Sequence, residues 1–280
     1  MPAPPNQFLF PAATAEPILK LLMAETVYSL ITGASSGIGE CFAHALAARR
    51  HNLVLVARSA DRLQALASEL AREHGILAEP VPLDLAAPGA AAGLAARLAD
   101  RGLAVDLLIN NAGFGAQGEF AKLPLARQAE MLALNITAVT ELTHLLVQPM
   151  MARRQGAVIN IASTASFQPV PYITLYAATK AFVYSFSVGL AEELKPYGVR
   201  VVTLCPGGTE TNFFEASGYE RPKFLGGLLT PKVVVADGLR RLDAGGGVVV
   251  SGLVNQATIF AQRFLPRSLP VKVAGKMFRP

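Results

Sequence analysis

The stretch Thr32-Gly33-Ala34-Ser35-Ser36-Gly37-Ile38-Gly39 decides the fold of this 280-residue chain. The apolar run 27–31 before it predicts a buried strand, and the apolar spacing over 40–50 after it predicts a helix. Glycines allow positive φ and close approach of the backbone, while a helix N-terminus offers unpaired N–H groups to an anion. The order strand, glycine turn, helix is therefore typical of a phosphate-binding loop. The alternative is a tight turn between core elements.

Short Val/Ile/Leu runs recur along the chain between Ala- and Leu-rich stretches with helical spacing. Continuous apolar strands flanked by helices predict a parallel sheet covered on both faces, so we expect one α/β, doubly wound, Rossmann-type domain. One helix is expected near 124–152, starting at Pro124. The strands are expected near 27–31, 53–56, 77–83, 105–109, 157–161, 199–204 and 248–250.

The end of the second expected strand carries Ala57 and then Arg58. In dinucleotide folds a carboxylate at this place binds the 2′-hydroxyl of NAD. A guanidinium instead binds a 2′-phosphate bidentately, which favours NADP. The alternative is that Arg58 is a solvated loop charge.

Three later strand ends offer further contacts to a nucleotide. Asn110-Asn111-Ala112-Gly113 has small side chains that leave room for a ring near the backbone. Asp84 is a candidate for the adenine edge, although a lone Asp at a strand end is also a common turn or N-cap residue. After Pro206-Gly207, the hydroxyls of Thr209 and Thr211 are candidates for a carboxamide or pyrophosphate oxygen, or are simple turn residues.

Tyr176, Lys180 and Ser163 form a candidate proton-transfer site. Residues at i and i+4 share one face of a helix, so the phenol and the ammonium are expected to point the same way. An ammonium about 5 Å away, at an effective dielectric of about 20, favours phenolate by roughly 3 kcal/mol. That energy lowers a phenol pKa by roughly two units from about 10. Ser163 is expected to hold the substrate oxygen against the phenol. The alternative is an amphipathic helix with a solvated lysine.

These motifs, in this order, resemble the short-chain dehydrogenase/reductase family over roughly 27–252. The resemblance rests on Thr32–Gly39, Asn110–Gly113, Asn135, Ser163, Tyr176, Lys180 and Pro206–Thr211. It implies a single domain with a seven-stranded parallel sheet. The family's second basic marker, a Lys or Arg at Ser35 or Ser36, is absent, so the NADP preference depends on Arg58 alone.

The resemblance also implies roles for individual residues. Tyr176 resembles the general acid/base, Lys180 the residue that lowers its pKa and holds the nicotinamide ribose, and Ser163 the hydroxyl that orients the carbonyl. Asn135 resembles the helix residue that keeps a relay water near Lys180. The expected cofactor-binding set is Gly33, Ser35, Ser36, Gly37, Ile38, Gly39, Arg58, Asp84, Leu85, Asn111, Ala112, Gly113, Tyr176, Lys180, Pro206, Gly207, Thr209 and Thr211.

Composition excludes several other classes of protein. Cys41 and Cys205 are the only cysteines and the four histidines lack ligand spacing, so we expect a reducing, cytoplasmic compartment and no metal site. The net charge of +5 fits solubility or attraction to an anionic cofactor or membrane. No basic stripe alternates with aromatic residues, so nucleic acid is not an expected partner.

The two ends are expected to differ from the domain between them. Residues 1–26 are Pro-rich and are expected to be a flexible extension, or to precede a true start at Met23. After Asp243 no acidic residue occurs. We expect 244–262 to form the last strand and an amphipathic helix, and 253–280 to be a basic apolar tail whose helix Pro266 and Pro270 interrupt. This tail is expected to pack on the protein or its pocket, or to contact a membrane.

The loops over Tyr176 are apolar and aromatic, and they predict a hydrophobic carbonyl or alcohol substrate. One loop is 167–172, and the other runs from Phe213 and Phe214 through Tyr219 to Phe224 and Leu225. The alternative is that these aromatics only close the core.

Together these features predict an NADP-dependent oxidoreductase that transfers hydride between NADP(H) and a carbonyl or alcohol. Relatives suggest a homodimer or homotetramer. A different class, a cofactor-binding regulator or scaffold without turnover, remains the alternative.

Overall fold

The computed structural model describes residues 26–217 and 226–279, and its centre is one parallel sheet. Seven strands lie in the order β3-β2-β1-β4-β5-β6-β7, and each neighbouring pair runs parallel. All seven apolar runs form strands, which confirms the doubly wound α/β prediction. The strands are β1 (Val27–Thr32), β2 (Asn52–Ala57), β3 (Ala78–Pro82), β4 (Ala104–Asn110), β5 (Gly156–Ile161), β6 (Val199–Cys205) and β7 (Gly247–Val250).

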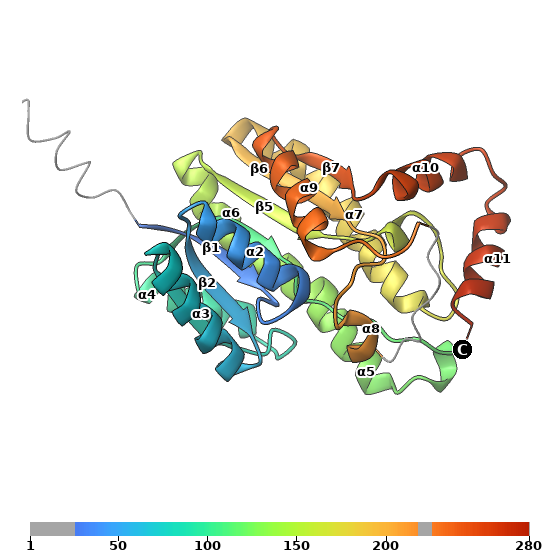
Figure 1. Cartoon of the computed structure of the whole chain (residues 1–280), viewed down its shortest axis with the longest axis horizontal. Coiled ribbons are helices and arrows are strands. Elements are labelled where there is room, and N and C mark those ends of the chain that lie inside the picture. The colour runs from blue at the N-terminus through green and yellow to red at the C-terminus, as the bar shows by residue number, and fades with distance from the viewer. Residues whose placement is uncertain (1–25, 218–225, 280) are drawn as a thin grey trace, which may run out of the picture.

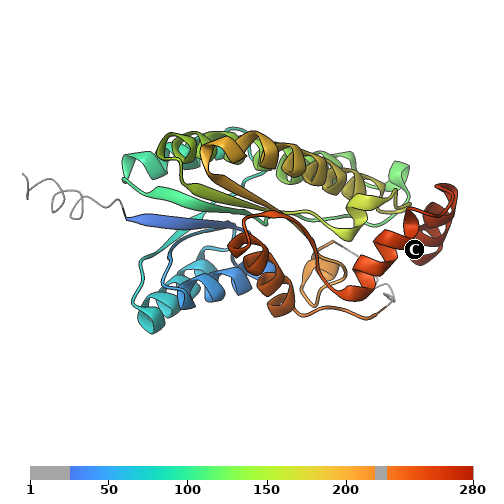
Figure 2. The same cartoon turned by 90° about the horizontal axis from the view of Figure 1, so that it is seen from above.

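Helices cover both faces of the sheet, as continuous apolar strands require. Figure 2 shows the sheet edge-on between two helical layers. One layer holds α2 (Gly37–Ala48), α3 (Ala60–His74) and α9 (Pro231–Asp243), and its buried cluster includes Phe42 and Leu239. The other layer holds α4 (Ala90–Asp100), α6 (Val139–Arg153) and α7 (Thr174–Leu194), and its cluster includes Leu94 and Leu142.

The order of the strands reverses between β1 and β4. Ile31 on β1 lies opposite Leu55 of β2 on one side and Ile109 of β4 on the other. The connections after β1 and β4 therefore leave the sheet in opposite directions, and such a point opens a crevice at the carboxyl ends of the strands. Figure 1 shows β1, β5 and β6, whose carboxyl ends point to this side of the sheet.

The helix expected near 124–152 is continuous but contains a π-helical segment. Pro124 precedes α5 (Leu125–Leu132), the π-helix η3 (Ala133–Ala138) follows, and α6 continues to Arg153. Among the described residues, this stretch alone is long and apolar enough to cross a membrane. Its side chains Leu142, Leu146 and Met150 are buried in the core, so it belongs to the helical layer on the sheet.

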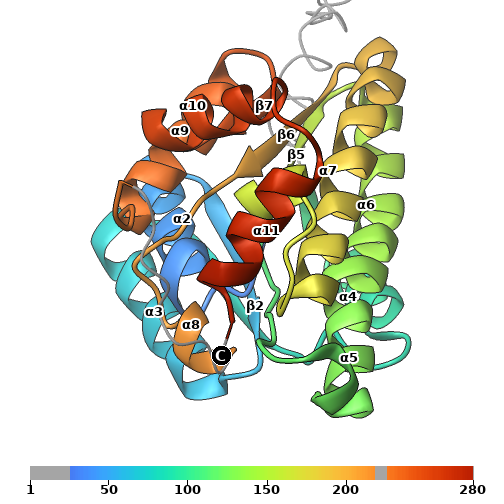
Figure 3. The same ribbon diagram turned by 90° about the vertical axis from the view of Figure 1, so that its right-hand side faces the viewer.

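The segment after β7 forms two helices, α10 (Leu253–Gln262) and α11 (Ser268–Met277). The expected strand and helix over 244–262 are thus confirmed. Pro266 lies between the two helices as predicted, but the prediction for Pro270 was wrong. Pro270 occupies the first turn of α11, where its missing N–H has no intrahelical partner to lose. Figure 3 shows α11 lying across one end of the molecule.

The remaining helical elements are short. They are η2 (Phe120–Lys122), η4 (Thr164–Phe167), η5 (Lys195–Tyr197) and α8 (Phe213–Ala216). Several sequence-based expectations lie outside the described residues: the extension 1–25 with its alternative start at Met23, and the loop residues Tyr219, Phe224 and Leu225.

Candidate active site

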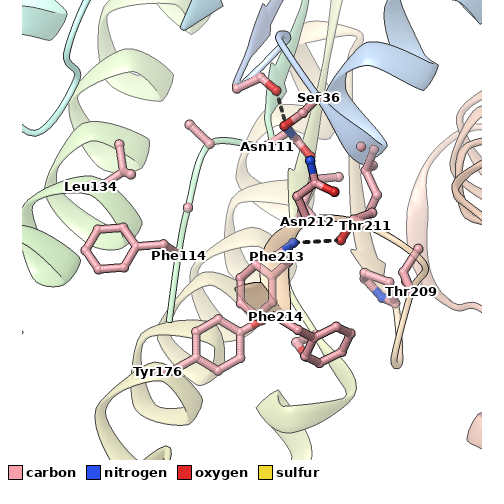
Figure 4. A pocket seen from close by; sticks show the side chains of 18 of the residues that line it. Ser36, Asn111, Phe114, Leu134, Tyr176, Thr209, Thr211, Asn212, Phe213 and Phe214 are labelled. Atoms are coloured by element: carbon pink, nitrogen blue, oxygen red, sulfur yellow. Dashed lines mark hydrogen bonds between the residues drawn. The ribbon is translucent and has the colours of Figure 1, made fainter. Parts of the chain in front are cut away.

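One pocket of about 460 Å³ lies at the carboxyl edge of the sheet, where its strand order reverses. Loops from both halves of the sheet line it, which is the place where α/β sheets bind ligands. Figure 4 shows how Tyr176, Phe213, Phe214 and Asn111 lie around it. Every expected cofactor-binding residue except Gly39 lines this pocket, and so do the expected catalytic residues Ser163, Tyr176 and Lys180.

The glycine turn packs against the turn after β4. Gly33 has a φ of +65°, and a Cβ atom there would lie 2.8 Å from Asn111 Nδ2. A Cβ atom on Gly39 would collide with the carbonyl oxygen of Gly33. These two glycines therefore serve the close fit between two loops, while Gly37, at φ +59°, begins α2 and lines the pocket. The N-terminus of α2 consequently faces the pocket.

Thr32 and Asn111 hold the two loops together, an arrangement that the sequence reasoning missed. Thr32 Oγ1 accepts hydrogen bonds from the backbone N–H groups of Asn111 and Ala112 at 3.0 and 2.9 Å. Asn111 Nδ2 in turn donates to the carbonyl oxygens of Thr32 and Gly33 at 2.9 and 3.2 Å. The available signal was the threonine at the end of the strand, directly before the glycine turn.

Arg58 lies at one end of the pocket and is already paired. Its Nη1 atom is 3.4 Å from Glu130 Oε1, and 67% of its side chain is exposed. Glu130 also binds Arg127, at 2.9 Å, so it bridges two guanidinium groups. An exposed pair of this kind contributes at most about 1 kcal/mol and exchanges readily.

Arg62 is a second basic residue at the same end, and the sequence reasoning did not consider it. It lies on α3, four residues after Arg58, and lines the pocket. The available signal was a second arginine in the first turn of the helix that follows Arg58.

The remaining expected nucleotide contacts lie on the pocket wall and also stabilise their own loops. Asp84 Oδ1 accepts from Ala86 N at 3.0 Å, so the turn role foreseen for it is real, and Leu85 lies beside it. Thr211 Oγ1 accepts from Phe213 N at 3.3 Å. Thr209 Oγ1 donates to the carbonyl oxygen of Gly207 at 3.0 Å.

Tyr176 and Lys180 face the same pocket from the first two turns of α7. The Nζ atom of Lys180 lies 5.9 Å from the centre of the Tyr176 ring. The expectation that they share one face is confirmed, because both line the pocket. Nζ donates to the carbonyl oxygen of Ile161 at 2.7 Å, which directs the ammonium to the end of β5.

The predicted direction of the phenol pKa was wrong for the protein alone. Burial raises the pKa of Tyr176 to about 12, and a hydrogen bond with the Ser163 side chain opposes this effect only in part. Burial also lowers the pKa of Lys180 to about 8. The prediction considered only the attraction between phenolate and ammonium. Desolvation of the two groups, which it left out, has the larger effect on both pKa values.

Ser163 is held in place by its own loop. It caps η4, where its Oγ accepts from Ala165 N at 3.1 Å. Ser166 completes the capping box: its Oγ accepts from Ser163 N at 3.2 Å and donates to the carbonyl oxygen of Lys180 at 2.8 Å. Ser166 thereby ties the Ser163 loop to the helix that carries Tyr176, a link that the sequence reasoning missed.

Asn135 connects the π-helix η3 to the loop after β4 and to α7. Its Oδ1 accepts from Phe114 N at 3.2 Å, and its Nδ2 donates to Phe114 O and Thr179 Oγ1, both at 3.0 Å. The side chain is fully buried. Both amide hydrogens are used in these contacts, and its expected part in holding a relay water stays a prediction.

Aromatic side chains form the other end of the pocket. The Tyr176 ring lies 5.4 Å from that of Phe213, and Phe213 meets Phe214 edge-on at 5.9 Å. Phe278, from the end of α11, lines the same pocket. The sequence predicted packing of the tail on the protein or its pocket as one of two outcomes, but it did not single out Phe278, because the tail gives no local signal of where it folds.

Comparisons with known proteins agree with this geometry. A family model described as short chain dehydrogenase matches residues 28–221. A very-long-chain 3-oxoacyl-CoA reductase from Phaeosphaeria nodorum is 36% identical over 179 residues, which are 62% of this chain and 52% of that protein. The chain thus spans about half the length of such curated relatives.

Solved structures match over more of the chain. A short-chain dehydrogenase from Sphingobium yanoikuyae in complex with NADPH has a TM-score of 0.76 and 34% identity, and the match covers 85% of this chain and 93% of that one. The bulky-bulky ketone specific alcohol dehydrogenase from Comamonas testosteroni has a TM-score of 0.72 and 32% identity, and the match covers 86% of this chain and 95% of that one.

Proposed function

The chain belongs to the short-chain dehydrogenase family, and on that premise we propose that it is an NADP-dependent oxidoreductase acting on a carbonyl or alcohol group. One observation carries the proposal: Ser163, Tyr176 and Lys180 line the same pocket as the glycine turn and the N-terminus of α2. The NADPH complex of a relative that is 34% identical supports it.

The residues of the pocket fit a phosphorylated dinucleotide. Gly37, Ser36 and the first N–H groups of α2 suit a pyrophosphate. Arg58 and Arg62 suit a 2′-phosphate, and Asp84 and Leu85 suit the adenine edge. Gly113 packs closely on Asn135 and Lys180, because a Cβ atom there would lie 3.0 Å from Asn135 Oδ1 and 3.5 Å from Nζ. Gly113 and Lys180 both line the pocket, and this part of its wall suits the ribose of a nicotinamide.

When bound, the nicotinamide supplies or accepts the hydride. Tyr176 donates its phenolic proton to the carbonyl oxygen as that oxygen gains charge, and it takes the proton back from the alcohol in the opposite direction. Ser163 donates a hydrogen bond to the same oxygen and fixes its position. The phenol is protonated at neutral pH, and burial raises its pKa further, so Tyr176 carries the proton that reduction requires.

Lys180 stabilises the phenolate that forms after the proton has left. Its ammonium is held by Ile161 and lies in the same buried region as the phenol. Charges in such a region interact more strongly than in water. Asn135 acts as a positioning residue that holds the loop at Phe114 and, through Thr179, the helix of the catalytic tyrosine.

The substrate that fits best is apolar. Phe213, Phe214, Phe278 and Ile173 line the pocket beside Tyr176. Relatives with printed activities on 3-oxoacyl-CoA and on ketones with two bulky groups support a hydrophobic ketone.

A panel of ketones and aldehydes with NADPH or NADH tests this function directly. We expect oxidation of NADPH with aryl or long-chain ketones, and slower oxidation of NADH. Tight binding of NADPH without turnover of any carbonyl or alcohol would instead identify a cofactor-binding regulator.

We further propose a homo-oligomer formed through the helical layer of α5, α6 and α7. Phe182 and Phe186 stack at 5.8 Å on α7, and apolar side chains of this layer are exposed, among them Leu125, Leu132, Phe182 and Val188. Light scattering after size exclusion tests it: the wild type should be a dimer or tetramer and Phe182→Asp a monomer. A monomeric wild type would contradict the proposal.

We also propose that the enzyme is cytoplasmic and touches membranes peripherally through α10 and α11. Free cysteines Cys41 and Cys205 fit the compartment. Exposed apolar residues on these helices and in the segments that join and follow them alternate with basic ones, a pattern that suits an anionic bilayer. They are Leu253, Phe260, Phe264, Leu269, Val273 and Met277, with Arg263, Arg267, Lys272, Lys276 and Arg279.

Sedimentation with phosphatidylserine vesicles tests the membrane contact. Phe264, which is 74% exposed, is replaced by Asp, and the matched control is Leu77→Asp just before β3, where 54% of the residue is exposed. The first variant should lose vesicle binding and the second should keep it. Equal binding by all three proteins would rule out this surface.

A further inference from the structure

The end of α11 forms one wall of the catalytic pocket. Ala274 and Phe278, one helical turn apart, are buried in a cluster that also contains Ile173 and Phe214. Phe278 lines the pocket together with Tyr176. Figure 3 shows α11 crossing this end of the molecule. The segment expected as a tail therefore contributes to the site itself.

Two polar contacts from different loops hold this wall. Gln117 Nε2 donates to the carbonyl oxygen of Phe278 at 2.7 Å. Arg279 Nε donates to the Tyr172 hydroxyl at 3.0 Å, and its guanidinium carbon lies 5.8 Å from the centre of the Tyr172 ring. The end of α11 is thus attached to the loop after β4 and to the loop after β5.

The loop that receives Arg279 has an uncommon backbone conformation. Tyr172 has a φ of +68°, a region that a residue with a bulky side chain seldom occupies. Its carbonyl oxygen accepts from Gly118 N at 2.8 Å. Next to it, a Cβ atom on Gly275 would lie 3.3 Å from Pro171 Cγ, so α11 approaches this loop closely. Such strain persists where surrounding contacts hold it, and here they present Tyr172 to α11.

We propose that α11 is a cap over the substrate end of the pocket and that Phe278 determines which ketones fit. The ring of Phe278 contacts the apolar substituent of a carbonyl whose oxygen is at Tyr176. A ketone substituent that is flat and compact fits against this ring. In a ketone with two bulky substituents, the second one collides with the ring. The inference rests on the proposed hydride-transfer function and adds the residue that selects the substrate.

Substitution of Phe278 by Ala, with Phe120→Ala as the matched control, tests the cap. Both changes remove a phenyl ring, but Phe120 is 60% exposed on the surface whereas Phe278 is 9% exposed and lines the pocket. We expect kcat/KM for benzophenone relative to acetophenone, with NADPH, to rise about tenfold or more in F278A and to change less than about twofold in F120A. A lower Tm with an unchanged ratio would show a merely structural role and overturn the proposal.

A second measurement tests, without any turnover, whether Phe278 covers the substrate end of the pocket. The fluorescent naphthyl ketone Prodan emits at longer wavelength when water reaches it. Prodan should bind to F278A more weakly than to the wild type, and its emission in that complex should lie at longer wavelength. The control F120A should match the wild type in both respects. Identical emission and affinity in F278A would refute the cap, even if the ketone panel fails and the proposed function falls with it.

Discussion

The ammonium of Lys180 lies 5.9 Å from the centre of the Tyr176 ring, one helical turn further along α7. The phenol has a pKa raised to about 12 and the ammonium a pKa lowered to about 8, each mainly by burial. Both groups are therefore protonated at neutral pH, the phenol neutral and the ammonium charged, which suits donation of the phenolic proton.

This arrangement predicts the pH dependence of ketone reduction. Below about pH 8 Lys180 is charged and stabilises the phenolate left after proton transfer; above it the charge is lost while Tyr176 stays protonated. The rate of reduction at saturating NADPH should therefore fall as pH rises through about 8. Lys180→Met should be slow at all pH values, without this inflection. A wild-type profile that stays flat up to about pH 10 would count against the role of Lys180.

The same shift predicts an effect on stability. Because the pKa of Lys180 falls from 10.5 to about 8 on folding, the unfolded chain binds more protons between these values, so stability rises with pH there. Below about pH 8 the buried charge costs up to about 3 kcal/mol. Lys180→Met should consequently unfold at the same or a higher temperature than the wild type at pH 7, with a smaller difference near pH 10. A large loss of stability would show that the lysine is mainly structural.

Arg58 should select NADPH over NADH. Removing its guanidinium in Arg58→Ala should weaken NADPH binding by about tenfold or more with little effect on NADH. Glu130→Gln should preserve or strengthen NADPH binding, because the carboxylate that now pairs with Arg58 is neutralised. Titration by cofactor fluorescence measures both. An equal loss for both cofactors in Arg58→Ala would remove Arg58 from the phosphate site.

Asn135 should matter for stability as well as for activity. Asn135→Ala leaves Phe114 N–H and C=O without their side-chain partner inside the protein and should cost about 2–4 kcal/mol. Thr179→Val, which removes one of the three contacts, should cost about 1 kcal/mol. Urea unfolding gives both values. An Asn135→Ala protein as stable as the wild type would show that the network is unimportant.

Local patterns were sufficient to predict the sheet and the composition of the pocket. Every strand was marked by a short apolar run, and the loops after parallel strands must meet at one edge, so Gly37, Ser163 and Tyr176 could be placed together. The same reasoning could not find Phe278 or Glu130. Their positions depend on how α11 and α5 pack, which no periodicity near them encodes. The phenol pKa was misjudged because burial is a property of the folded chain.

The most direct test of the account is the reduction of a ketone by Tyr176→Phe at saturating NADPH, measured with the affinity for NADPH. This change removes one oxygen atom and keeps the ring that packs on Phe213. We predict that kcat falls by about 10²-fold or more while the Kd of NADPH stays within about threefold of the wild type. Turnover close to that of the wild type would contradict the assignment of Tyr176 as the proton donor.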